Sequence, residues 1–164
     1  QNLIYFPGSS IGNYEPEQAK AVLSKLRELT NGGALLIGVD TQKDPDVLER
    51  AYDDSEGVTA RFNLNLLKRL QHELGAELKV EDFEHKAIYN TELGRIEMHL
   101  VAQRDTSITI NGETFSLKQG ETIHTECSYK YKPAMFADMA KSIGFAHNRV
   151  FMDERQYFSI HVMW

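Results

Sequence analysis

The chain has 164 residues, with 24 acidic and 18 basic side chains and a formal net charge of −6. This length suits a domain with a sizeable core, and the acidic balance argues against a nucleic-acid partner. The apolar runs are too short to span a bilayer, so we expect no membrane partner. A single cysteine, Cys127, excludes an intramolecular disulfide and fits a reducing, cytoplasmic compartment.

The first forty residues are typical of a strand, a loop, a helix and a second strand. Apolar runs at residues 3–6 and 34–40 flank an amphipathic helix that begins at Pro16 and ends before Asn31. Neither run alternates apolar with polar residues, which predicts strands buried on both faces, as in a parallel sheet. The loop from Gly8 to Asn13 leaves the carboxyl end of the first strand, where open α/β sheets bind ligands. The alternative is a tight turn that binds nothing.

The middle of the chain changes from helical to extended periodicity. Helical patterns run from Val47 to about Leu74, and Gly57 separates a short helix from a longer one. Residues 95–103 then alternate as in a half-buried strand, and residues 106–110 and 114–118 flank Asn111-Gly112, a strong hairpin signal. Residues 120–131 form another extended stretch, whose end at 129–132 is typical of an amphipathic strand rather than a nucleic-acid surface.

A helix from Pro133 to Gly144 and a terminal hairpin, 149–153 with 157–162, complete the pattern. We therefore expect an α/β fold in which residues 1–46 and 132–164 belong to one sheet-based domain, with residues 47–131 as an inserted α+β region. No G-x-G-x-x-G follows any strand, so the first strand and glycine-rich turn of a dinucleotide-type fold would precede this sequence. The first residue is Gln1 rather than Met, which suggests a trimmed or excised piece.

This order of elements resembles the C-terminal half of a class I S-adenosylmethionine-dependent methyltransferase, with its Rossmann-like sheet. Four motifs, FPGSSIGN (6–13), AYDDSEGVTARFNLN (51–65), RIEMHL (95–100) and GETIHTECSYKY (120–131), are similar to those of the L-histidine Nα-methyltransferase family. That family makes histidine betaine (hercynine) on the route to ergothioneine. The resemblance covers nearly the whole chain, and it implies S-adenosylmethionine as cofactor and the α-amino group of L-histidine as methyl acceptor.

The resemblance also implies roles for residues near the first loop and the second motif. Gly8 matches the glycine where the family's cofactor approaches, although turn geometry alone also suits it. Asn13 matches the asparagine that holds the amino acid's backbone groups; its alternative is a helix N-cap. Tyr52 matches a tyrosine that donates to the substrate carboxylate, while a surface tyrosine packed on its neighbours is the alternative. Asp53 and Asp54 are interpreted as solvated or capping groups.

The last two motifs carry the expected ring contacts. Met98 matches a methionine packed on the imidazole, with ordinary core as its alternative. Glu126 and Ser128 share a strand face by alternation, and in the family this pair reads the two ring nitrogens. His124 is expected on that face too, but one histidine and one glutamate are too few ligands for a metal, so we expect none. No catalytic acid or base is predicted, because positioning dominates this methyl transfer.

Three alternatives stay open at this stage. The same pocket could take another amino acid, or the chain could be a non-catalytic amino-acid-binding module that lacks the cofactor half. The family's N-terminal half, with the glycine-rich cofactor loop, has no counterpart in this sequence. That half could have been cut away, be disordered, or be supplied by a second chain.

Overall fold

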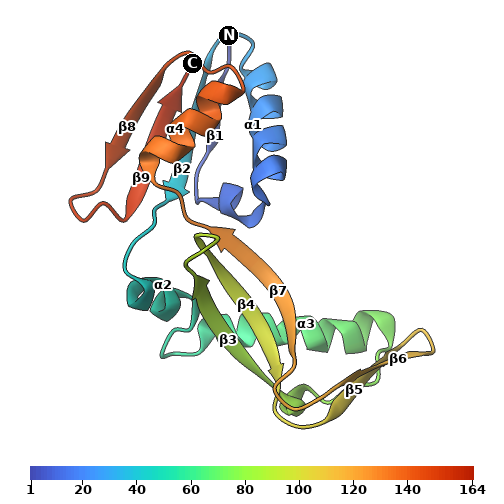
Figure 1. The fold of residues 1–164 in the computed structure, drawn as a ribbon. Coiled ribbons are helices and arrows are strands. Elements are labelled where there is room, and N and C mark those ends of the chain that lie inside the picture. Colours follow the sequence, from blue (N-terminus) through green and yellow to red (C-terminus); the bar gives the residue numbers. More distant parts are fainter. The chain divides into compact units, whose positions relative to one another are not determined.

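The computed structural model describes residues 1–164 and shows a mixed α/β protein with four helices, nine strands and two short 3-10 turns (Figure 1). In chain order the elements are β1 (Leu3–Phe6), η1 (Ser10–Asn13), α1 (Pro16–Thr30), β2 (Ala34–Asp40), α2 (Pro45–Tyr52), α3 (Val58–Leu74), η2 (Val80–Asp82), β3 (Phe83–Asn90), β4 (Arg95–Ala102), β5 (Thr106–Ile110), β6 (Glu113–Leu117), β7 (Thr122–Tyr129), α4 (Pro133–Ser142), β8 (Asn148–Met152) and β9 (Phe158–Met163). The α/β class predicted from the sequence is confirmed. None of the helices is long and apolar enough to cross a membrane.

The chain forms two compact units, and each is described by itself. The first unit contains residues 1–44, 90–95 and 127–164, and the second contains residues 45–89 and 96–126. The sequence places the corresponding boundaries after residues 46 and 131, without a return to the first unit at 90–95. Strand β7 begins in the second unit, and its last three residues belong to the first.

The first unit is built on a four-stranded sheet with the order β1-β2-β9-β8. Strands β1 and β2 are parallel, with Leu3 opposite Ala34, whereas β9 runs antiparallel to both β2 and β8. The short connection between β8 and β9 makes them the terminal hairpin that the sequence predicts. The carboxyl ends of β1 and β2 therefore lie at one edge of the sheet, and the loop from Gly8 to Asn13 leaves from that edge.

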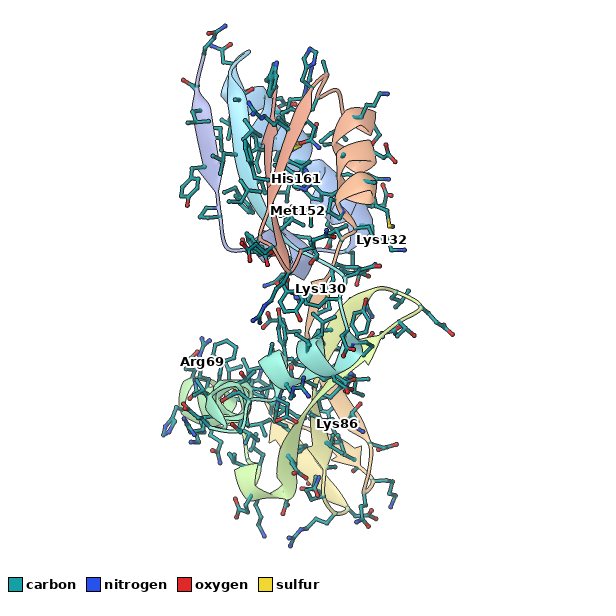
Figure 2. All side chains as sticks on the ribbon, turned by 90° about the vertical axis from the view of Figure 1, so that its left-hand side faces the viewer. Arg69, Lys86, Lys130, Lys132, Met152 and His161 are labelled. Atoms are coloured by element: carbon teal, nitrogen blue, oxygen red, sulfur yellow. The ribbon has the colours of Figure 1, made fainter.

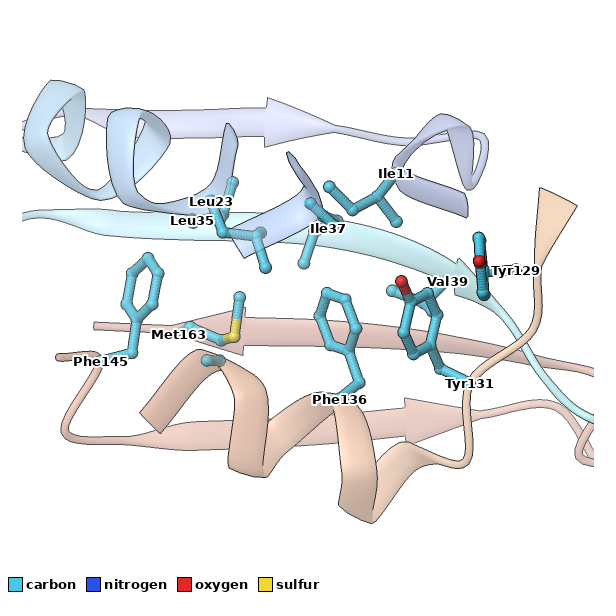
Figure 3. Close-up of a cluster of buried hydrophobic side chains, with 12 residues drawn as sticks. Ile11, Leu23, Leu35, Ile37, Val39, Tyr129, Tyr131, Phe136, Phe145 and Met163 are labelled. Carbon is cyan, nitrogen blue, oxygen red and sulfur yellow. The ribbon is translucent and has the colours of Figure 1, made fainter. Parts of the chain in front are cut away.

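Both helices of the first unit, α1 and α4, pack on the same face of this sheet. The inward residues of β2, namely Leu35, Ile37 and Val39, form one core with Leu23 of α1 and Phe136 of α4 (Figure 3). All five side chains are fully buried. Burying side chains of this size contributes roughly 1.5–3 kcal/mol each. This core holds the sheet edge and the loop that follows β1 in a fixed relation.

The opposite face of the sheet exposes large apolar side chains. Leu3 and Tyr5 of β1 are each 68% exposed, and Phe151 of β8 and Ile160 of β9 are 48% and 38% exposed. The strand registers place all four on the face that α1 and α4 do not cover. The prediction that the first strand is buried on both faces is therefore wrong for this chain, because its two helices share one face.

The second unit combines a three-stranded sheet, β3-β4-β7, with helices α2 and α3 and the hairpin β5-β6. Helix α3 packs on the sheet through Leu67, which forms a core with Phe83 of β3 and Leu100 of β4. Gly57, with φ +65°, immediately precedes α3, which confirms the predicted separation of the two helices. A separate cluster joins Leu48 of α2 to the first half of β4.

Strand β3 is the element that the sequence does not predict. Phe83, His85 and Ala87 are buried and alternate with exposed neighbours, so β3 has the period of a half-buried strand. Two of these three inward residues are histidine and alanine, which weakens the apolar signal. The β5-β6 hairpin is confirmed, and both turn residues, Asn111 and Gly112, have the positive φ of a type I′ turn.

Candidate substrate and cofactor site

The loop from Gly8 to Asn13 is fixed to the end of the neighbouring strand. Gly8 has φ +79°, a left-handed conformation that favours glycine. The backbone N–H of Asp40, the last residue of β2, donates to Ser9 Oγ at 2.7 Å. Residues Ser10–Asn13 then form the turn η1. The loop is thus held at the sheet edge where the sequence predicts ligand binding.

Gly12 brings this loop against the end of β7. A Cβ atom at Gly12 would lie 2.6 Å from the Tyr129 carbonyl oxygen and 3.3 Å from Ser128 Oγ, so only glycine fits there without displacement. The neighbouring Asn13 carbonyl oxygen lies 4.0 Å from Cys127 Sγ. Within the first unit, the structure therefore brings the segments of Asn13 and Ser128 together.

Asn13 does not cap helix α1. The N-cap is Glu15, whose backbone N–H donates to Gln18 Oε1 at 3.2 Å in a capping box. Asn13 instead ends η1 with an exposed side chain. The N-cap alternative is wrong, and Asn13 is an exposed residue whose backbone carbonyl lies near Cys127 of β7.

Ser128 is linked to a buried charge network that the sequence analysis does not identify. Lys130 Nζ donates to Ser128 Oγ at 2.9 Å and lies 2.8 Å from Asp40 Oδ2. Lys43 makes a second ion pair with Asp40. Lys130 is buried whereas Lys132, two residues on, is exposed (Figure 2). No local pattern distinguishes the two lysines, because residues 130 and 132 share one face of a regular strand.

Tyr52 and Met98 belong to one apolar cluster in the second unit. Met98 is 4% exposed and packs with Leu48 and Ile96, and Tyr52 lies against this group. The Tyr52 carbonyl oxygen accepts a hydrogen bond from His85 Nε2 at 2.8 Å, which fixes the end of α2 to β3. Two of the predicted substrate residues are therefore neighbours, and Met98 is also part of a core.

The two carboxylates after Tyr52 have different surroundings. Asp54 accepts hydrogen bonds from the backbone N–H groups of Thr59 (2.8 Å) and Val58 (2.9 Å) at the start of α3. These hydrogen bonds, of which the one from Thr59 has the largest effect, hold the pKa of Asp54 well below its usual range. Asp53 is exposed. The predicted capping role is confirmed for Asp54.

Glu126 is half-buried and is the last residue of β7 that belongs to the second unit. His124, two residues earlier in β7, lies near residues of β4. The His124 ring stacks on His99 with a centroid distance of 4.9 Å, and Glu97 Oε2 lies 3.3 Å from His99 Nε2. Potential metal-binding atoms of these three residues lie within 4.8 Å of one another. The two ring planes are only 20° apart, so their in-plane lone pairs do not converge on one point. Burial, as the largest cause, lowers the pKa of His99.

The predicted site residues divide equally between the two units. Gly8, Asn13 and Ser128 lie in the first unit, and Tyr52, Met98 and Glu126 lie in the second.

Comparison with known proteins identifies the family. Residues 1–164 match the family described as "Histidine-specific methyltransferase, SAM-dependent". The chain therefore belongs to the histidine-specific methyltransferases, whose methyl donor is S-adenosylmethionine.

Relatives include two bacterial histidine N-alpha-methyltransferases and a fungal enzyme. The Mycolicibacterium smegmatis protein is 38% identical over 87% of this chain and 46% of its own length, and the Mycobacterium tuberculosis protein is 36% identical over 98% and 51%. The L-tryptophan methyltransferase of Psilocybe serbica is 28% identical over 96% and 45%. The chain thus spans about half the length of these relatives. A solved S-adenosylmethionine-dependent methyltransferase from Clostridium acetobutylicum superposes with a TM-score of 0.44 and 11% identity, over 98% of this chain and 56% of its own.

Proposed function

We propose that this chain is the C-terminal half of an S-adenosylmethionine-dependent N-methyltransferase that converts L-histidine to histidine betaine (hercynine). The observation that carries this proposal is the contact of the Asn13 loop with the Ser128 end of β7, through Gly12. It joins two segments to which the family resemblance assigns amino-acid contacts. The match of the whole chain to a histidine-specific family supports the same substrate.

In this proposal the substrate's backbone end and ring end have separate partners. The amide of Asn13 donates to the carboxylate and accepts from the amine, and the phenol of Tyr52 donates to the carboxylate. Glu126 accepts from a ring N–H, and Ser128 binds the other ring nitrogen. Met98, next to Tyr52 in its apolar cluster, packs on the ring through its polarizable thioether.

The chemistry asks these residues to bind and orient rather than to transfer protons. The bound cofactor supplies an electrophilic methyl group, and the acceptor is the neutral α-amine. A free α-amino group titrates near ~8, so its neutral form is accessible at neutral pH. Holding the amine in line with the methyl group is the main contribution of the protein.

Two features of the first unit support a further segment that completes the cofactor site. Gly8 offers open backbone, because a Cβ atom there would meet no atom within 4 Å, and this suits close approach of a ligand. The uncovered sheet face, with Leu3 and Tyr5 each 68% exposed, is the kind of surface that a second helical layer covers in α/β proteins. We propose that the N-terminal half of the enzyme, or a second chain, supplies this layer and the glycine-rich turn.

A second candidate keeps the reaction and changes the amino acid. The similarity to an L-tryptophan methyltransferase makes tryptophan the specific competitor. In this proposal Glu126 favours histidine, because it is placed for the N–H of an imidazole; the larger indole also has an N–H but would turn an apolar edge toward the carboxylate. A non-catalytic amino-acid-binding module is the remaining alternative, and methyl transfer by the full-length protein would exclude it.

The experiment is histidine binding by calorimetry with the full-length protein and its variants Asn13→Ala and Tyr52→Phe. Each change removes a hydrogen bond to a charged group, at a cost of roughly 1.5–3 kcal/mol, while cofactor affinity should stay nearly constant. Tyr14→Phe is the matched control, because Tyr14 is a neighbouring exposed phenol without an assigned role. Unchanged histidine affinity in both variants would contradict the proposed amino-acid site.

A further inference from the structure

Lys130 is the most deeply buried cation of the first unit, and its partners are specific. Its side chain is 0% exposed, its Nζ lies 2.8 Å from Asp40 Oδ2, and it donates to Ser128 Oγ at 2.9 Å. Its backbone N–H donates to the Gly94 carbonyl at 2.8 Å. Burying an ammonium group is costly unless it is paired and hydrogen-bonded, and Asp40 provides that pairing. The positively charged ammonium group of Lys130 is thus held in a hydrogen bond to the hydroxyl of Ser128.

The direction of the contact between Lys130 and Ser128 is fixed by chemistry. An ammonium group has three donors and no acceptor, so Ser128 Oγ is the acceptor. A hydroxyl group that accepts from a cation is polarised, which strengthens it as a donor and weakens it as an acceptor toward a second partner. A neutral imidazole has one N–H and one nitrogen lone pair, and only the lone pair matches a hydroxyl donor.

We propose that Lys130 is a positioning residue that makes Ser128 a hydrogen-bond donor to the unprotonated ring nitrogen of the histidine substrate, an inference that rests on the proposed function. Glu126 then accepts from the ring N–H, and the two contacts together select a neutral imidazole. An indole has an N–H but no nitrogen lone pair for Ser128, so Lys130 also disfavours tryptophan. Lys130 acts only through Ser128 and touches no reacting atom.

Lys43 provides a matched control within the same network. It also pairs with Asp40, and it donates to the Tyr157 carbonyl at 2.8 Å, but its side chain is 13% exposed and it makes no hydrogen bond to Ser128. Lys43→Met and Lys130→Met therefore both remove one cationic partner of Asp40. Only Lys130→Met removes the donor to Ser128.

The test is a double-mutant cycle for histidine binding, measured by calorimetry on the full-length protein with the demethylated cofactor present. Ser128→Ala and Lys130→Met should each weaken histidine binding by on the order of 10-fold, and the double variant should be no weaker than either one. Lys43→Met should retain histidine binding within about twofold, and cofactor affinity should be unchanged throughout.

The outcomes separate this inference from the proposed function. If Ser128→Ala binds histidine normally, the assigned role of Ser128 is wrong and the proposed function loses one of its ring contacts. If Ser128→Ala weakens histidine binding and the losses of the two single variants add in the double variant, then Lys130 is only structural. The same conclusion follows if Lys43→Met weakens histidine binding as much as Lys130→Met does. If Lys130→Met fails to fold, the test is instead made by NMR on the unmodified protein, by following the side-chain ammonium signals of its lysines. Lys43→Met identifies which signal belongs to Lys43. Histidine should then shift the Lys130 signal and leave that of Lys43 in place, and an unmoved Lys130 signal would overturn the inference.

Discussion

The α-carbon of Gly12 faces the backbone of Tyr129 so closely that an added methyl group would lie 2.6 Å from the Tyr129 carbonyl oxygen. The first loop and the end of β7 therefore approach each other without any intervening side chain. Both segments carry residues of the proposed amino-acid site, Asn13 and Ser128. The close approach of these two segments requires a residue without a side chain at position 12.

Gly12→Ala should displace the loop and weaken histidine binding by at least about 10-fold, because overpacking in a tight contact costs typically ~1–3 kcal/mol. Calorimetry with histidine measures the effect in the full-length protein. Ser10→Ala is the control, since Ser10 is exposed in the same loop and should bind histidine normally. Normal histidine binding by Gly12→Ala would mean that this contact does not position the site.

A buried histidine should make the stability of the first unit depend on pH. His161 is 0% exposed, and its burial lowers its pKa to about 4 (Figure 2). The unfolded side chain titrates near ~6.5, so between these values the unfolded chain binds a proton that the folded chain does not. Stability is therefore retained above the unfolded pKa and decreases by up to about 3 kcal/mol as the pH falls toward 4.

The measurement is the free energy of unfolding at pH 7 and pH 4.5 for the unmodified protein and for His161→Gln. The variant removes this titration, so its loss of stability between the two pH values should be smaller. His72→Gln serves as control, because His72 is exposed on α3 and should retain the full pH dependence. An equal loss in all three proteins would assign the pH dependence to other groups.

Asp54 should stabilise the start of helix α3, whereas its neighbour Asp53 should not. Asp54→Ala removes the acceptor of two backbone N–H groups and should lower the melting temperature by a few degrees, the usual scale for losing a helix cap. Asp53→Ala leaves those hydrogen bonds in place and should have little effect. Thermal unfolding of the two variants distinguishes them, and equal melting temperatures would contradict the capping role.

Local signals in the sequence predict most of the first unit. Pro16, the helical spacing of the apolar residues after it and the glycines after Thr30 suffice to place α1 between two strands. The exposure of Leu3 and Tyr5 could not be predicted, because burial of a strand's second face depends on what packs there and not on the strand itself. An apolar run alone does not tell one covered face from two.

Parts of the candidate site that depend on local turn residues were predictable from the sequence. Parts that depend on contacts between distant segments were not. The Gly8–Asn13 loop carries its own turn chemistry, so its position after β1 follows from the sequence. The stacking of His99 on His124 joins strands β4 and β7, and the pairing of Lys130 with Asp40 joins β2 to the residue after β7. Neither pair has a spacing that a local pattern could reveal.

We propose that Glu126 and Met98 make the full-length enzyme select histidine by its ring. The most direct measurement is kcat/KM for histidine and for tryptophan with the full-length protein, Glu126→Ala, and Glu126→Ala combined with Met98→Val. We predict that the unmodified enzyme prefers histidine, that Glu126→Ala lowers this preference by at least about 10-fold, and that the double variant moves further toward tryptophan as the ring space widens. A ratio that stays constant across the three proteins would contradict the claim and assign ring recognition to other residues.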